Sequence, residues 1–109
     1  MKGKIVLVPF PFTDLTGSKL RPALVLVEGE TDCVVAFISS RIPAQPSTKG
    51  LLIQQDHKEF RLTGLKTASV IRLDKVATIS RNIILGEIGE IGESLRKEVT
   101  KILRETYQL

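Results

Sequence analysis

The stretch "KIVLVPFPFTDLTGSKLRPALVL", residues 4–26, decides the fold because it places two apolar runs on either side of a polar loop. The first run, Lys4–Phe10, is rich in β-branched residues, and Pro9 and Pro11 are expected to end it as a strand. Residues 21–28 are predicted to form a second strand. The loop that connects these two strands is about ten residues long, whereas a tight hairpin needs two, and such long loops often contain functional residues.

Further strand patterns follow this pair along the chain. Residues 31–40 are predicted to form a third strand after the turn sequence "EGE". The runs 21–28 and 31–40 are apolar at odd and even positions, so we expect both to be central strands covered on both faces. After a loop-like stretch, "RIPAQPSTKG", three more segments carry strand signals, namely "LLIQQ", "SVIRLDKVATIS", which offers one or two strands, and "NIILGEIGEI". Seven short strand candidates with turn signals about every 8 to 12 residues predict a mainly β fold, either a small barrel or a strongly bent sheet.

The end of the chain has a different period. Residues 92–107 place apolar side chains at helical spacing on one stripe, which predicts an amphipathic helix that packs on the sheet. The residues of this stripe are Leu95, Val99, Ile102, Leu103 and Thr106.

Length and composition restrict the class of protein. The 109 residues are expected to form a single domain, 1–109, with an aliphatic core, since 42% of residues are hydrophobic and only 5% aromatic. The net charge of +4 favours a polyanionic partner without establishing one. Cys33 is the one cysteine and lies in an apolar run, so we expect no disulfide and no thiolate metal site. The sequence shows no Gly-rich phosphate cradle and no cluster of His and Cys, so no cofactor is expected. It also shows no signal-peptide pattern and no run near 18 apolar residues, so a cytoplasmic protein is expected.

Arg21 is the first candidate site residue. It directly precedes Pro22, which restricts it to an extended backbone at a strand start, and its planar guanidinium suits a phosphate oxygen. The alternative is a surface ion pair with Asp14 within the same loop. From the residues alone, both interpretations stay open.

Arg72 and Asp74 form the second candidate pair. At period two their side chains share one strand face with Cα atoms about 7 Å apart. A carboxylate there could take a proton from a 2′-hydroxyl while the guanidinium stabilises the charge on a phosphorane. The alternative is a salt bridge on a solvated strand.

Ser39 and Arg41 stand where an apolar strand gives way to a loop, in the sequence "ISSR". A hydroxyl at this place can donate to a phosphate or bond the local backbone, and the two interpretations weigh equally. The single histidine, His57, is expected to be a surface residue and is left outside the candidate site.

Three matching stretches give the sequence a resemblance to the MazF/PemK family, the toxins of type II toxin-antitoxin pairs. They are residues 2–26 with their Arg-Pro step, "VVAFISSRI", and "TASVIRLDKVATI" followed by "NIILGEIGEI" and the closing helix. The resemblance implies an SH3-like barrel with a C-terminal helix, usually a homodimer inhibited by a cognate antitoxin protein. It also implies metal-independent cleavage of single-stranded RNA, in which 2′-hydroxyl attack yields a 2′,3′-cyclic phosphate.

The resemblance also assigns residue roles. Arg21 falls on the arginine of the family's Arg-Pro motif, a catalytic position, and Ser39 falls where many members carry a catalytic threonine. Arg72 and Asp74 match an acid-base pair that some PemK-like members use and others lack, so the general base is left open. The loop before Arg21 departs from one common family pattern, and the cleavage sequence is therefore not carried over.

The remaining cations and aromatic residues are the candidates for RNA binding. Lys19, Arg41 and Lys49 could follow a phosphate backbone together with the arginines of the site. Phe10, Phe12 and Phe60 are the stacking candidates, and Phe12 is preferred because Phe10 is as well suited to a core. Two alternatives remain beside the ribonuclease: a non-enzymatic toxin with a similar barrel, CcdB-like, that binds DNA gyrase, and a catalytically silent family member that only binds a partner.

Overall fold

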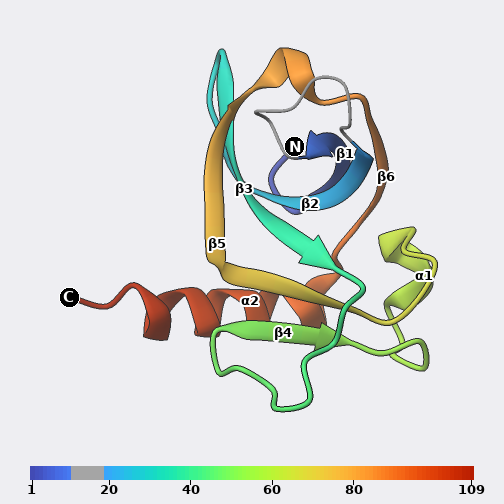
Figure 1. Cartoon of the computed structure of the whole chain (residues 1–109). Helices are drawn as coiled ribbons and strands as arrows, with labels where there is room; N and C mark the ends of the chain where they lie inside the picture. Colours follow the sequence, from blue (N-terminus) through green and yellow to red (C-terminus); the bar gives the residue numbers. More distant parts are fainter. Residues whose placement is uncertain (11–18) are drawn as a thin grey trace.

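Six strands and one long helix make up most of the structure, a computed structural model that describes residues 1–10 and 19–109 (Figure 1). The strands are β1 (Lys4–Phe10), β2 (Lys19–Glu28), β3 (Asp32–Ser39), β4 (Gly50–Ile53), β5 (Ser69–Ser80) and β6 (Gly86–Glu90). The helices are the single-turn α1 (Phe60–Thr63) and the long α2 (Glu93–Thr106), with a 3₁₀ turn at Arg81–Ile83. In these residues no helix is both long enough and apolar enough to cross a membrane.

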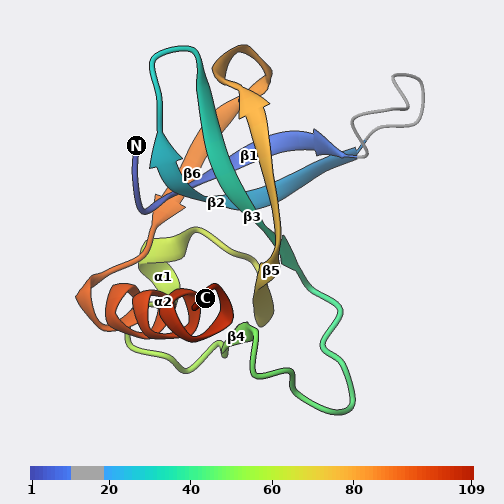
Figure 2. The same cartoon turned by 90° about the vertical axis from the view of Figure 1, so that its left-hand side faces the viewer.

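The strands form one antiparallel sheet in the order β4-β5-β3-β2-β1-β6. The sheet curls strongly, but its two edge strands do not pair with each other in the described chain, so it is a half-barrel (Figures 1 and 2). The prediction of a mainly β, barrel-like fold with a C-terminal helix is confirmed. The expectation that the second and third strands are central is also confirmed, because β2 and β3 each have neighbours on both sides.

The differences from the predicted strands are local. β2 begins at Lys19, so Pro22 lies inside the strand rather than at its start. Pro22 pairs with Leu7 of β1, whereas the pairing with β3 begins only at Ala23, so the missing N–H of Pro22 interrupts no bond to β3. The last strand candidate is shortened to β6 because Arg81–Ile83 forms a 3₁₀ turn. The Ser80 side chain caps this turn by accepting a hydrogen bond from the backbone N–H of Asn82.

Two hydrophobic cores lie on opposite faces of the sheet. The first core joins the sheet to α2, which contributes the buried Leu95 and Val99, so the predicted apolar stripe does pack on the sheet. The second core lies on the other face and consists of Val6, Val8, Ala23, Val25, Cys33, Val35 and Ile79. Because β2 and β3 contribute to both cores, their double-faced apolar pattern is explained.

The N-terminus of α2 is capped by a residue from another element. Gly92 at the N-cap position has no side chain to offer, and the carboxylate of Glu59 instead accepts the amide N–H groups of Ser94 and Leu95, both at 2.9 Å. Partial burial alone would raise the pKa of Glu59, but these two hydrogen bonds and the nearby charges of His57 and Lys58 bring that pKa below its usual 4.5. Ionised Glu59 therefore stabilises the attachment of α2 to the segment before α1.

Replacing Glu59 by glutamine is expected to lower the free energy of unfolding by about 1 kcal/mol at pH 7, the usual value of a helix cap. Since the pKa is lowered on folding, the contribution is present above pH 4.5 and is lost as the pH falls through the folded-state value. Urea unfolding at pH 7 and pH 3 should show a larger difference from wild type at pH 7 than at pH 3. Glu93→Gln, in the first turn of α2 but 86% exposed, is the control and should cost less than about 0.5 kcal/mol.

Candidate active site

The strand register places three of the candidate side chains on one face of the sheet. Ala23 of β2 pairs with Phe37 of β3, and Phe37 pairs in turn with Arg72 of β5. Arg21 lies two residues before Ala23 on β2, and Ser39 lies two residues after Phe37 on β3. Because residues two apart on a strand share a face, Arg21 and Ser39 lie on the same face as Arg72. At a strand spacing of about 4.8 Å, roughly 10 Å separates β2 from β5, so the two arginines can reach one phosphodiester from opposite sides.

Asp74 joins this face through an irregularity in β5. Ala36 pairs with Val76, but the next residue, Phe37, pairs with Arg72, so residues 73–75 lie outside the pairing with β3. This segment, which we call the β5 bulge, coincides with the sharp turn of β5 in Figure 1. Bulges bend a strand and change the direction of its side chains. Within this bulge the Asp74 carboxylate lies beside Arg72, with Nε to Oδ1 at 3.4 Å and Nη2 to Oδ2 at 3.5 Å.

The Arg72–Asp74 pair is accessible to a ligand. The two side chains are 32% and 29% exposed, and their ion pair is long for a charge-assisted bond. The predicted common face of the two residues is confirmed, and so is the salt bridge that was the alternative to a catalytic role. A phosphate that draws the Arg72 guanidinium away would leave the carboxylate free to accept a proton.

Arg21 is exposed on β2, opposite Val8 of β1. It forms no salt bridge with any residue that the structure describes. Asp14, the alternative ion-pair partner, lies outside the described residues. Among the described residues, the exposed Arg21 side chain therefore has no salt-bridge partner to hold it away from a ligand on this face.

Ser39 ends β3 and is half-buried. Its Oγ accepts the backbone N–H of Arg41 at 3.1 Å, which is the local backbone bond considered above. This hydrogen bond uses one lone pair of the Ser39 oxygen and leaves its proton unused. The hydroxyl proton has no acceptor among the described residues and stays available to a phosphate oxygen.

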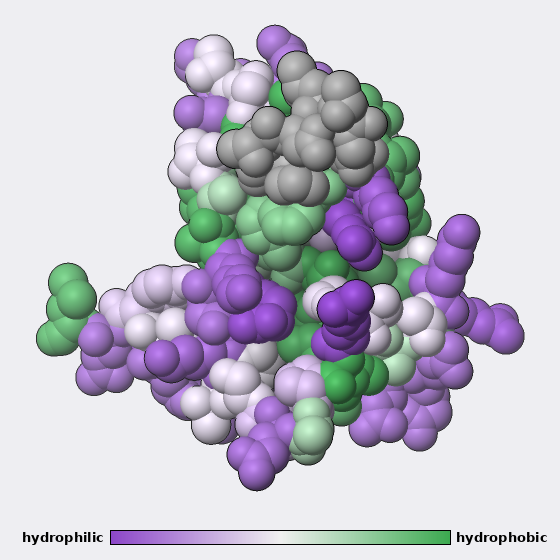
Figure 3. Space-filling view, viewed as in Figure 1, coloured by the Kyte–Doolittle hydropathy of each residue, from purple (hydrophilic) through white to green (hydrophobic). Residues whose placement is uncertain are grey.

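Lys19, Arg41 and Lys49 surround this face and are exposed. Lys19 lies two residues before Arg21 on β2, and Arg41 follows Ser39. Lys49 lies next to the β5 bulge, because its carbonyl accepts the N–H of Leu73 at 3.1 Å. The ends of β1 and β2 and the segment before β4 project from the same side of the molecule (Figure 2), and that side exposes hydrophilic groups next to hydrophobic surface (Figure 3).

An aromatic pair lies on the same face, because Phe37 pairs with Arg72 and Phe10 lies two residues after Val8, the partner of Arg21. The rings of Phe10 and Phe37 have centroids 5.1 Å apart at 56°, and Phe10 remains 40% exposed. Phe37 was missed in the sequence because it stands within an apolar run, although its spacing of two from Ser39 places it on the same face. Phe12, the preferred stacking residue, lies outside the described residues.

Two sequence candidates are not brought to this face. Phe60 starts α1 and packs against the first core, on the opposite side of the sheet, so it is not placed for stacking in this site. His57 is used within its own turn, where Nδ1 accepts the N–H of Glu59 at 3.0 Å. This position of His57 in the turn before α1 agrees with its exclusion from the candidate site in the sequence analysis.

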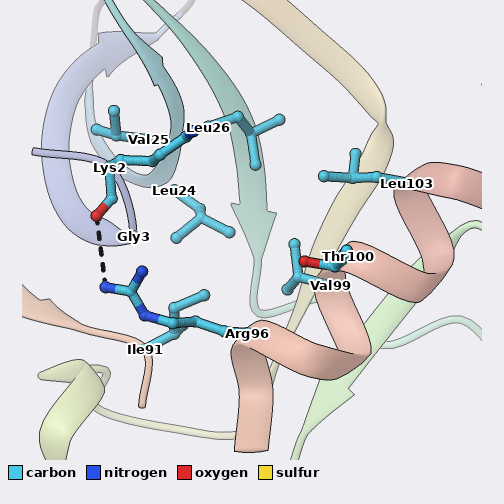
Figure 4. Close-up of a pocket in the computed structure, with 10 residues that line it drawn as sticks. All are labelled: Lys2, Gly3, Leu24, Val25, Leu26, Ile91, Arg96, Val99, Thr100 and Leu103. Atoms are coloured by element: carbon cyan, nitrogen blue, oxygen red, sulfur yellow. Dashed lines mark hydrogen bonds between the residues drawn. The ribbon is translucent and has the colours of Figure 1, made fainter. Parts of the chain in front are cut away.

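A separate hollow of about 450 Å³ lies along α2, on the side of the first core (Figure 4). Its lining is mainly aliphatic, and Lys2, Arg96 and Thr100 are its longer polar side chains; Arg96 donates to the Lys2 carbonyl at 3.5 Å. The hollow has no carboxylate in its lining. It is therefore a weaker candidate for acid-base chemistry than the face that carries Asp74. Within the described ranges, no three histidine, cysteine or acidic side chains are grouped as a metal site would need.

Comparison with known proteins gives one family and a set of similar structures. The family model of the "PemK-like, MazF-like toxin of type II toxin-antitoxin system" matches residues 1–107. The Mycobacterium tuberculosis toxin MazF-mt6 has a TM-score of 0.75 at 19% identity, with 97% of each chain covered. An endoribonuclease in complex with its cognate antitoxin, from a mycobacterial species, has a TM-score of 0.75 at 12% identity, covering 100% of this chain and 95% of the other. No curated protein sequence matches the chain significantly. The structural likeness confirms the fold.

Proposed function

The chain belongs to the PemK-like, MazF-like toxin family of type II toxin-antitoxin systems, and from this premise we propose that it is a metal-independent endoribonuclease that cleaves single-stranded RNA. The observation that carries the proposal is the grouping of Arg21, Ser39, Arg72 and Asp74 on one accessible sheet face. The family alone would permit a binding toxin. A carboxylate and two guanidiniums around one solvent-open surface are what transfer of a phosphodiester needs.

The proposed reaction uses each group once. A phosphate bound between Arg21 and Arg72 loosens the ion pair of Arg72 with Asp74, and the freed carboxylate accepts the proton of the 2′-hydroxyl. The 2′-oxygen bonds to phosphorus, the bond from phosphorus to the 5′-oxygen breaks, and that oxygen takes a proton from water. The guanidiniums and the Ser39 hydroxyl hydrogen-bond to the oxygens on which charge develops. The products are a 2′,3′-cyclic phosphate and a 5′-hydroxyl end.

RNA binding is assigned to the rim of this face. Lys19, Arg41 and Lys49 would contact flanking phosphates, so affinity should fall with rising salt. The exposed ring of Phe10, which contacts the ring of Phe37, suits stacking of a base next to the cleaved bond. Phe12 also remains a proposed stacking residue.

The proposed partners follow from the family. They are mRNA in the cytoplasm, a cognate antitoxin protein and a second copy of the chain, with residues 1–109 acting as one domain. The endoribonuclease of similar fold that was solved with its cognate antitoxin supports the second of these.

The experiment is incubation of the purified, partner-free protein with a single-stranded RNA in EDTA. Cleavage with 2′,3′-cyclic phosphate and 5′-hydroxyl ends, identified by mass spectrometry, is expected. Intact RNA after long incubation with folded protein would contradict the proposal. An inhibition of DNA supercoiling by the same preparation would then support the gyrase-binding alternative.

Replacing Asp74 by asparagine is expected to slow cleavage about ten- to a hundredfold, since the general base is lost while water can still take the proton. The side chain keeps its shape, and binding of RNA should change less than twofold. Asp56→Asn, an exposed carboxylate in the turn after β4, is the matched control. Equal cleavage by both variants would remove Asp74 from the mechanism.

A further inference from the structure

We propose that Tyr107, the residue directly after α2, is a positioning residue that holds the Asp74 carboxylate in place beside Arg72. This proposal rests on the proposed function. The phenolic hydroxyl of Tyr107 donates a hydrogen bond to the backbone carbonyl of Leu73, at 2.5 Å. That carbonyl belongs to the peptide group that joins Leu73 to Asp74. A rotation of this peptide group would move the Asp74 side chain relative to Arg72.

The β5 bulge is where such an outside contact is needed. Because residues 73–75 lie outside the pairing with β3, β3 does not fix their peptide groups. The structure holds Leu73 in three other ways: its N–H donates to the Lys49 carbonyl at 3.1 Å, its side chain is fully buried in the first core, and its carbonyl accepts the Tyr107 hydroxyl. Of these three contacts, the bond from Tyr107 is the one made to the peptide group that leads directly into Asp74.

Tyr107 is poorly placed to serve the core. It is 49% exposed and stands after the last residue of α2, where its N–H donates to Leu103 at 3.0 Å. The ring thus contributes little burial for its size, whereas its hydroxyl bridges α2 to the β5 bulge. Because its hydrogen bond goes to a backbone carbonyl, Tyr107 acts through the backbone and not through contact with RNA.

Tyr107→Phe removes this hydroxyl alone. The expected result is a kcat for cleavage of a short single-stranded RNA that falls about five- to tenfold, the value of one lost hydrogen bond, with KM changed less than twofold. Thr100→Val is the matched control, because it removes a hydroxyl from the same helix that makes no hydrogen bond with the described residues; it should cleave like wild type. A Tyr107→Phe protein with unchanged kcat would overturn the proposal.

A double-mutant cycle separates positioning from general stability. If Tyr107 acts through Asp74, adding Tyr107→Phe to Asp74→Asn should lower kcat less than twofold further. If the two effects multiply, Tyr107 acts elsewhere and the proposal is wrong.

A second readout does not depend on cleavage. In Tyr107→Phe, the amide of Asp74 should change its NMR chemical shift and exchange its hydrogen faster than in wild type, while Thr100→Val leaves both unchanged. If wild-type protein cleaves no RNA, the proposed function fails, yet this measurement still decides whether Tyr107 sets the peptide group. An unchanged Asp74 amide would overturn the positioning role.

Discussion

Replacing Arg21 by alanine is expected to lower the rate of RNA cleavage by 100- to 1000-fold while the protein stays folded. Arg21 is the cation on the β2 side of the site, opposite the Arg72–Asp74 pair, and no other described arginine lies on that strand. Removal of one preorganised donor to the charge of a transition state typically costs a factor of this size. Because the side chain is exposed and makes no ion pair with a described residue, its loss should change the free energy of unfolding by less than about 0.5 kcal/mol.

Two further variants sharpen the Arg21 experiment. Arg21→Lys keeps the charge but loses the planar fork, so it should recover part of the rate only. Arg61→Ala removes an exposed arginine from α1, which contacts the other face, and should cleave normally. Full cleavage by Arg21→Ala would instead favour the surface ion pair with Asp14 as the role of this arginine.

Replacing Gly64 by alanine is expected to lower the free energy of unfolding by more than about 3 kcal/mol, a large part of the stability of a small domain. Gly64 ends α1 in the left-handed region, with φ of +72°, which an L-residue adopts at a cost. A Cβ there would also overlap the backbone carbonyl of Ile88 in β6. Since the neighbour is backbone, no side chain can move aside to make room.

Gly86→Ala provides the comparison for Gly64→Ala. Gly86 lies in the same strand that Gly64 approaches, but a Cβ at Gly86 meets no atom within 4 Å. Urea unfolding should therefore place Gly86→Ala within about 1 kcal/mol of wild type. A Gly64→Ala protein as stable as Gly86→Ala would show that α1 and β6 can separate without cost.

Most of the fold could be predicted from local sequence signals. The run Lys4–Phe10 was predicted with its observed limits because it is rich in β-branched residues and has Pro9 near its end and Pro11 after it. The closing helix was found from its apolar stripe. The stretch that contains α1 was expected to be irregular or a short turn, since its four helical residues are too few to show a helical period.

The site was predicted in part. Arg72 and Asp74 were placed on one face by their spacing, but the β5 bulge that joins them was not predicted, because it arises from two different pairing registers with β3. Tyr107 was missed for a similar reason, because its role depends on which strand lies next to it, whereas Phe37 was missed because it stands within an apolar run. Spacing along one strand predicts its own face, whereas contacts between strands need the fold.

The half-barrel leaves two sheet edges, β4 and β6, and these edges differ in how they avoid joining other chains. β4 is only four residues long, and short edges are poor templates for added strands. β6 is scarcely longer, at five residues, and beside its free edge α1 packs on its face, where the backbone at Thr63 lies so close to Gly89 that a Cβ there would overlap it. The single turn of α1 thus covers the face of β6 next to an unpaired edge, and weakening it should expose that face and promote association between chains before it unfolds the rest of the protein.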